Sequence, residues 1–263
     1  MHVFRGNVRK TLEQLQPVSG SILEAKYVST CTEKVDVENI LFYNIGSKSF
    51  KHSQCRNIYF ERIFGKPPEC PNVGEMPHYI SYTLTDKRDN WRPNGRLIVH
   101  WKNLDFMKVN SSTKPDSIWY QFQSCIKAEK VKRDSNLNII DKKFGLKLVL
   151  HAPKNTDLNL TSIVKPLFDG IIASFSGHND SSDIALKRLA SKLNADQKQI
   201  THFLKNEKMA VLGVRKLIVP RSTGIQWLPR DDLLVCGVLS LEDNNPQDKW
   251  LLSGELFIIE NKI

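Results

Sequence analysis

Two stretches of this sequence place acidic residues and a lysine at spacings that could do chemistry. The first is "NTDLNLTSIVKPLFD", which contains Asp157, Lys165 and Asp169, and the second is "LPRDDL", which contains Asp231 and Asp232. Carboxylate oxygens are the ligands that Mg²⁺ prefers, and a nearby lysine ammonium stabilises negative charge that develops on a phosphate. Brought together by a fold, these residue types could assist hydrolysis of a phosphate ester.

Each stretch also has an ordinary structural interpretation. Polar residues ahead of a helix are common N-caps, and Lys165 with Asp169 forms an i,i+4 pair of the kind found on many helix surfaces. An acidic pair after a proline, as in Asp231 and Asp232, suits a solvated turn before a strand. The spacing alone leaves both interpretations open.

Hydrophobic periodicity predicts the elements that would carry these residues. Alternation of apolar residues predicts strands over 78–86, 95–106 and 144–153, and helical spacing predicts a helix over 114–130. A second helix is predicted from a stripe with 3.6-residue spacing, made of Ile163, Val164, Leu167, Phe168, Ile171, Ile172 and Phe175. Pro166 is tolerated only in the first turn, so this helix should begin near residue 162.

The order of the elements predicts a mixed α/β (α+β) fold, a small mixed sheet with packed helices. Two polar helices are predicted within 181–208, and strand-like runs close the chain. The proline- and glycine-rich segment 64–79 predicts a boundary or long connection. Residues 1–80 then form an N-terminal extension whose role the sequence leaves open, and no internal repeat is evident.

The composition limits the classes of protein to which this chain could belong. The chain has 263 residues, a formal net charge of +10 and five widely spaced cysteines, a pattern that argues against a zinc finger or disulfide framework. No apolar run is long enough to span a bilayer and no signal peptide is recognised, so a soluble, cytoplasmic protein with no membrane association is expected. The positive charge favours a polyanion such as nucleic acid as partner.

Two basic stretches are candidates for nucleic-acid contacts. The first, "TDKRDNWRPNGR", interleaves an aromatic side chain with cations, a mixture that suits phosphate contacts and base stacking. The second, "KAEKVKR", follows the helix predicted over 114–130. The candidate residues are Lys87, Arg88, Trp91, Arg92, Arg96, Lys130, Lys132 and Arg133. The alternative is that both stretches are solvated loops.

The region around Lys165 resembles the RusA-type Holliday-junction resolvases. In that family a strand ending in a proline-containing stretch precedes D-x-D-N-x-x-K-x-x-x-D, and an acidic pair opens a later strand. Here the strand is "LKLVLHAP", the lysine is Lys165, the last aspartate is Asp169, and the pair is Asp231 and Asp232. The resemblance covers roughly residues 95–243.

The sequence departs from the family pattern at the first acidic positions. Counting back from Lys165, the two family aspartates fall on Asn159 and Thr161, and Asp157 lies two residues before the first of them. Asp157 could take over only if the loop carries a local shift.

The resemblance implies an activity and a set of site residues. It implies an α/β domain over 81–263 with a helical insertion at about 177–215, acting as a Mg²⁺-dependent (or Mn²⁺-dependent) endonuclease on branched or single-stranded DNA, as a homodimer. Asp157, Asp231 and Asp232 would hold the metal, and Lys165 and Asp169 would complete the catalytic set. The alternative is a non-catalytic nucleic-acid-binding subunit of a larger assembly, with a degenerate site.

Overall fold

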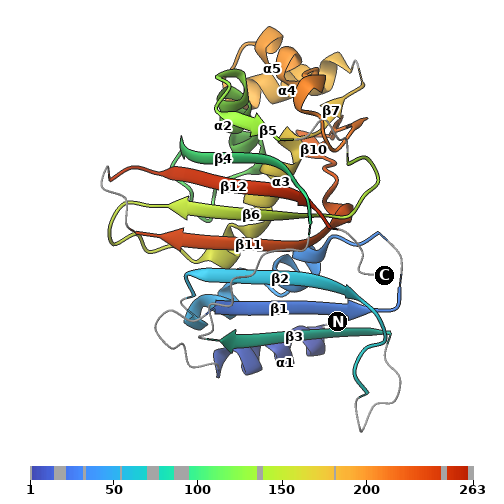
Figure 1. Cartoon of the computed structure of the whole chain (residues 1–263), viewed down its shortest axis with the longest axis vertical. Helices are drawn as coiled ribbons and strands as arrows, with labels where there is room; N and C mark the ends of the chain where they lie inside the picture. Colours follow the sequence, from blue (N-terminus) through green and yellow to red (C-terminus); the bar gives the residue numbers. More distant parts are fainter. Residues whose placement is uncertain are drawn as a thin grey trace.

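The chain folds around one mixed sheet (Figure 1). The computed structural model describes residues 2–14, 22–31, 34–53, 55–69, 77–85, 95–134, 139–180, 182–243 and 248–259. The eight-stranded sheet has the order β3-β1-β2-β11-β6-β12-β4-β5. Its strands are β1 (Ile22–Ser29), β2 (Asn57–Phe64), β3 (His78–Thr85), β4 (Leu97–Asp105), β5 (Val131–Arg133), β6 (Phe144–His151), β11 (Leu234–Glu242) and β12 (Leu251–Ile258). The mixed α/β fold predicted from the sequence is confirmed.

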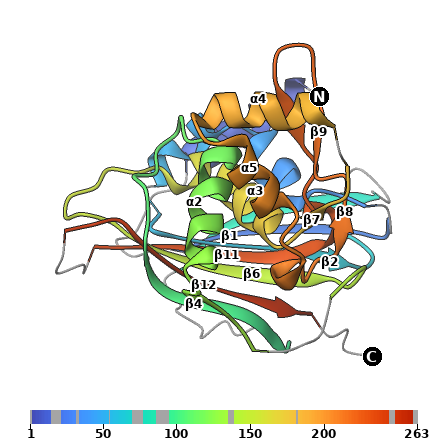
Figure 2. The same ribbon diagram turned by 90° about the horizontal axis from the view of Figure 1, so that it is seen from above.

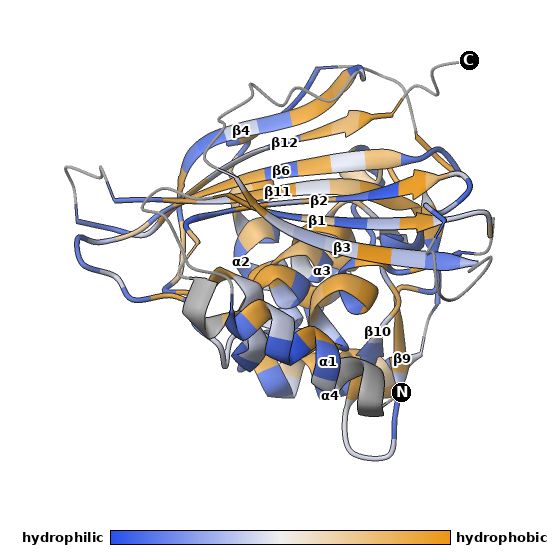
Figure 3. Ribbon diagram, turned by 90° about the horizontal axis from the view of Figure 1, so that it is seen from below, coloured by the Kyte–Doolittle hydropathy of each residue, from blue (hydrophilic) through white to orange (hydrophobic). Residues whose placement is uncertain are grey.

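The helices lie on one side of this sheet (Figure 2). They are α1 (His2–Glu13), α2 (Pro115–Lys127), α3 (Val164–Ser174), α4 (Asp183–Leu193) and α5 (Gln197–Leu204). Figure 3 shows that α3 is mostly hydrophobic, whereas α1 mixes hydrophobic and hydrophilic residues. The difference follows from position, because α3 is buried between the sheet and the outer helices while α1 is covered on one side only.

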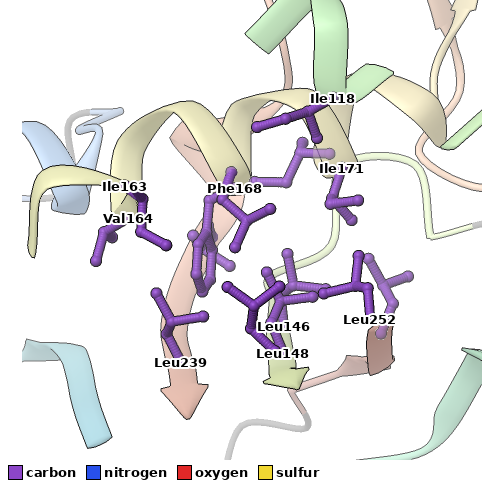
Figure 4. Close-up of a cluster of buried hydrophobic side chains, with 14 of the residues drawn as sticks. Ile118, Leu146, Leu148, Ile163, Val164, Phe168, Ile171, Leu239 and Leu252 are labelled. Atoms are coloured by element: carbon purple, nitrogen blue, oxygen red, sulfur yellow. The ribbon is translucent and has the colours of Figure 1, made fainter. Parts of the chain in front are cut away.

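Helix α3 is fixed in place by its apolar stripe. All seven residues of the predicted stripe are fully buried, and Phe168 and Ile171 point toward Leu146 and Leu148 of β6 (Figure 4). Burying one such side chain is worth roughly 1.5–3 kcal/mol, so the rotation of the helix about its axis is strongly determined. Pro166 lies in the first turn, as predicted, because α3 begins at residue 164.

The predicted helical insertion forms a further layer outside α2 and α3. Both polar helices predicted within 181–208 are confirmed as α4 and α5. They pack through Leu189 and Phe203 onto Trp119 of α2 and Ala173 of α3. Around them lie the short strands β7 (Gly177–His178), β8 (Val214–Arg215), β9 (Ile218–Pro220) and β10 (Ile225–Trp227).

The sheet contains two units with the same topology. In the N-terminal unit, β1 leads through the helical turn η1 (Asn39–Tyr43) to the parallel strand β2, and then to β3, antiparallel to β1. In the C-terminal unit, β6 leads through α3 to the parallel strand β11, and then to β12, antiparallel to β6. Strands β2 and β11 are antiparallel neighbours, so an approximate twofold axis passes between them.

The two units meet through tight packing at this axis. The ring of Phe168 on α3 lies 5.2 Å from the ring of Phe60 on β2. Gly237 of β11 makes room for both, because a Cβ atom there would lie 2.2 Å from Phe60 and 2.6 Å from Phe168. Residues 22–64, whose role the sequence left open, thus supply two strands of the common sheet. No repeat is evident in the sequence because the units share strand order and not residues.

The described part of the chain contains no helix long and apolar enough to cross a bilayer.

Candidate functional site

A buried cluster of charged side chains lies where the two units meet. The ammonium nitrogen Nζ of Lys165 is 2.6 Å from Oδ2 of Asp36, 2.7 Å from Oδ1 of Asp169 and 3.0 Å from Oδ2 of Asp231. All four side chains are between 12% and 19% exposed. We name these four residues the Lys165 cluster. One ammonium is thus shared by three carboxylates from three separate segments.

Local structure explains how each member is held. Asp36 precedes η1, and its Oδ1 accepts a hydrogen bond of 2.9 Å from the backbone N–H of Asn39. Lys165 and Asp169 are one turn apart on α3, so they share a helix face beside the apolar stripe. Asp231 is the first residue of the 3₁₀ turn η5 (Asp231–Leu233), which leads directly into β11.

Glu38 adds a fourth carboxyl group next to the cluster. It is fully buried, and a side-chain hydrogen bond joins it to Asp36. Burial, and then the negative charge of Asp36, raise the pKa of Glu38 well above its usual value. Burial of a charge is costly, so burial favours the neutral form of Glu38.

Burial and charge shift the pKa of every member of the cluster. Burial raises the pKa of Asp169 to about 6 and that of Asp231 to about 7, although Lys165 acts to lower both. For Asp36, burial is outweighed by the Lys165 ammonium and by hydrogen bonds, and the pKa falls. Burial also opposes the charge on Lys165, but the surrounding carboxylates raise its pKa and keep it protonated.

A cavity of about 630 Å³ lies beside the cluster. Lys165 and Asp169 form part of its wall, and Tyr43, Thr113 and Lys114 are among the other lining residues. The side chain of Tyr43 is exposed (70% for the residue). The cavity therefore reaches Lys165 and Asp169, whereas Asp36, Glu38 and Asp231 are not among its described lining residues.

Asp232 lies among basic side chains and not in the cluster. Its carboxylate is 3.6 Å from Lys34 Nζ, 3.5 Å from Arg230 Nε and 4.0 Å from an Arg215 guanidinium nitrogen. We name Lys34, Arg215 and Arg230 the basic rim. Sequence analysis predicted Asp231 and Asp232 as a pair of metal ligands, but the structure brings only Asp231 to Lys165.

The polar residues of the loop before α3 cap the helical turn that leads into this helix. Oδ1 of Asn159 accepts hydrogen bonds from the backbone N–H and the hydroxyl of Thr161, at 3.1 and 2.8 Å, and its amide donates to the Ser47 carbonyl. Asp157 is exposed, and within the described ranges no ion pair joins it to the Lys165 cluster. In the described loop Asp157 therefore lies apart from the Lys165 cluster.

The predicted nucleic-acid contacts are only partly covered by the structure. Lys87, Arg88, Trp91 and Arg92 lie outside the described residues, and Arg96 is exposed just before β4. The remaining candidates lie at the β5 edge of the sheet. There Lys130 is 3.8 Å from Asp105, Lys132 is exposed, and Arg133 donates to the Lys208 carbonyl.

Sequence analysis missed Asp36 and Glu38. They lie in "VDVENILFYN", which the pattern of apolar residues leaves ambiguous between strand and helix. The available signal is the run Asp36-x-Glu38-Asn39, which repeats, with glutamate in second place, the D-x-D-N run expected before Lys165. The run Asp36-x-Glu38-Asn39 lies in the N-terminal unit, whereas Lys165 and Asp169 lie in the C-terminal unit.

No family model, curated protein or solved structure matches this chain. The fold and the cluster define a mixed α/β protein with a buried acidic site, and its chemistry is inferred from them.

The stability of the metal-free protein should fall between pH 5 and pH 8. The folded-state pKa values of Asp169 and Asp231, about 6 and 7, lie above the value of about 3.9 for an unfolded chain. Their contribution is therefore complete below the unfolded value and is lost as the pH rises through the folded values. We expect the free energy of unfolding to drop by roughly 4 kcal/mol over this range.

Urea unfolding in EDTA at each pH measures this fall. The Asp231→Asn variant should flatten the profile, because its amide does not titrate. A wild-type stability that rises from pH 5 to pH 8 would contradict the assignment.

Proposed function

We propose that this protein is a metal-dependent endodeoxyribonuclease whose active site is the Lys165 cluster with Glu38. The observation that carries the proposal is the convergence of Asp36, Asp169 and Asp231 on one lysine, at 2.6–3.0 Å, next to the fully buried carboxyl group of Glu38. Here the carboxylates outnumber the single cation, which favours a site built to receive a second cation.

The donor set fits Mg²⁺ or Mn²⁺. Hard divalent cations take carboxylate oxygens as ligands, and Asp36, Glu38 and Asp231 would supply them. Among the described residues no group of three carboxylate, histidine or cysteine side chains already has metal-binding geometry. Lys165 lies between the carboxylates, so its ammonium would move aside toward the cavity when a metal binds. When bound, the metal would lower the pKa of a water molecule and neutralise charge on the phosphate.

The side chains of the chain itself have separate tasks in this proposal. Asp231, whose carboxylate lies 3.0 Å from the Lys165 ammonium, would serve as a metal ligand. Lys165 stays protonated and would stabilise the negative charge that develops on the phosphate oxygens. Asp169, one turn away on α3, holds Lys165 in position at 2.7 Å.

A second candidate function is nucleic-acid binding without cleavage, as a subunit of a larger assembly. The observation that favours it is the position of the Lys165 ammonium, which already neutralises part of the carboxylate charge at the centre of the cluster. In that case the cluster is a structural remnant. The net charge of +10 supports a polyanionic partner in both cases.

Branched or single-stranded DNA is the substrate that the resemblance to RusA-type resolvases favours. The resemblance alone supports a homodimer.

Incubation of the protein with labelled four-way junction, matched duplex and single strands tests the proposal. Each substrate is treated with Mg²⁺, Mn²⁺ or EDTA, beside the Asp231→Asn variant. We expect cleavage with a divalent metal, none in EDTA, and none from the variant. Salt-sensitive binding without cleavage in every metal would reject the nuclease and support the second candidate.

A further inference from the structure

We propose that the basic rim of Lys34, Arg215 and Arg230 is a binding site for a backbone phosphate of the nucleic acid, next to the one held at the Lys165 cluster. In this assignment Asp232 is a positioning residue that gathers the three cations, and not a metal ligand. The inference rests on the proposed function, because it adds a second phosphate position to the same site.

The rim is fixed to the cluster by the covalent chain. Lys34 lies two residues before Asp36, and Arg230 immediately precedes Asp231, while Arg215 arrives from β8. The basic rim and the Lys165 cluster are therefore direct neighbours. A strand that places one phosphate at the acidic centre would carry its next phosphate past the basic side chains.

The contacts with Asp232 leave N–H groups of the three cations available for further hydrogen bonds. The three distances to Asp232 are 3.5–4.0 Å, longer than the 2.7–2.9 Å of a charge-assisted hydrogen bond. Asp232 Oδ1 and Arg230 Nε are both buried and have no hydrogen-bond partner among the residues that the structure describes. A phosphate has more acceptor oxygens than this one carboxylate and could be bound by all three cations.

The local charge supports an anion on this side. Arg230 also contacts Asp141 at 2.6 Å, and Arg215 donates to the Pro229 carbonyl at 3.4 Å. Within the rim itself, three cations face two carboxylates, Asp232 and the exposed Asp141, which leaves one positive charge on the side away from the acidic cluster. Arginine is suited to this task because its planar guanidinium binds phosphate through two parallel hydrogen bonds.

Binding of a fluorescent single-stranded oligonucleotide in EDTA, measured by anisotropy at several salt concentrations, tests the rim without requiring catalysis. Lys34→Ala and Arg215→Ala should each weaken binding several-fold and reduce the slope of log K against log salt by about 0.7. Arg215→Lys should keep the slope, since the charge remains. Lys187→Ala, which removes a comparably exposed cation paired with Asp183 on α4, is the matched control and should leave the slope unchanged.

A second measurement separates the two roles of Asp232. Titration with Mn²⁺ should give the same affinity for Asp232→Asn as for wild type, whereas a metal ligand would lose affinity. Unchanged salt slopes in both alanine variants, or loss of Mn²⁺ binding in Asp232→Asn, would overturn the inference. Inorganic phosphate is then added as a competitor. If it displaces the oligonucleotide from the wild-type protein but not from the Lys34→Ala and Arg215→Ala variants, the rim is the phosphate site.

The two proposals can fail separately. Metal-dependent cleavage together with an unchanged salt slope would reject the rim and keep the nuclease. A reduced slope without cleavage in any metal would keep the rim as a phosphate site and reject the nuclease.

Discussion

Asp36→Asn is expected to lower metal-dependent cleavage by roughly 10²–10³-fold, the range seen when one charge-stabilising group is removed from an active site. The substitution keeps the shape of the side chain and can still accept the hydrogen bond from the Asn39 backbone. It removes the negative charge that faces Lys165 at 2.6 Å. Initial rates of nicking at saturating Mg²⁺ measure the effect, and near-UV circular dichroism checks the fold.

Two further variants locate the active carboxylates. Asp183→Asn, on the exposed start of α4, should cleave like the wild type. Asp157→Asn tests the assignment made from the sequence, and it should lose far less activity than Asp36→Asn because Asp157 lies outside the cluster. The reverse ranking would place the metal in the loop before α3 and reject the cluster as the site.

Lys165→Met should destabilise the metal-free fold by roughly 3–5 kcal/mol at pH 8, the usual cost of removing one partner from a buried ion pair. Methionine fills a similar volume, so the loss is electrostatic: three buried carboxylates are left without a cation. The cost should shrink at pH 5.5, because Asp169 and Asp231, with pKa values of about 6 and 7, become protonated. Urea unfolding in EDTA at both pH values gives the difference.

Metal rescue distinguishes a cation site from an ordinary buried pair. Millimolar Mn²⁺ should restore much of the stability of Lys165→Met, since it replaces the lost positive charge among the carboxylates. The matched control is Lys187→Met, which breaks an exposed i,i+4 pair and should cost no more than about 0.5 kcal/mol. A Lys165→Met variant as stable as the wild type in EDTA would show that the carboxylates do not depend on the lysine.

The sequence was informative wherever the physical signal was local. The stripe of α3 follows from 3.6-residue spacing, and it placed Lys165 and Asp169 on one face of a helix beginning near Pro166. Asp36 contacts Lys165 across 129 positions of the chain. No periodicity carries information over that distance, so only the acidic run Asp36-x-Glu38 could have indicated it.

The acidic pair shows a second limit. Asp231 and Asp232 are adjacent and identical, but they lie in a 3₁₀ turn with about three residues per turn, so their side chains diverge by roughly 120°. One reaches Lys165 and the other reaches the basic rim. The direction of each side chain depends on how η5 joins β11. No pattern in the sequence indicates whether Asp231 or Asp232 faces Lys165.

The approximate twofold axis between β2 and β11 relates the strands of the two units but not their charged residues. The N-terminal unit contributes Asp36 and Glu38, and the C-terminal unit contributes Lys165, Asp169 and Asp231. The described part of the chain therefore has one such centre, and its acidic side and its basic side lie in a fixed order. A nucleic-acid strand laid across that centre would be held with one 5′-to-3′ direction, so a single chain would act on one strand of a duplex at a time.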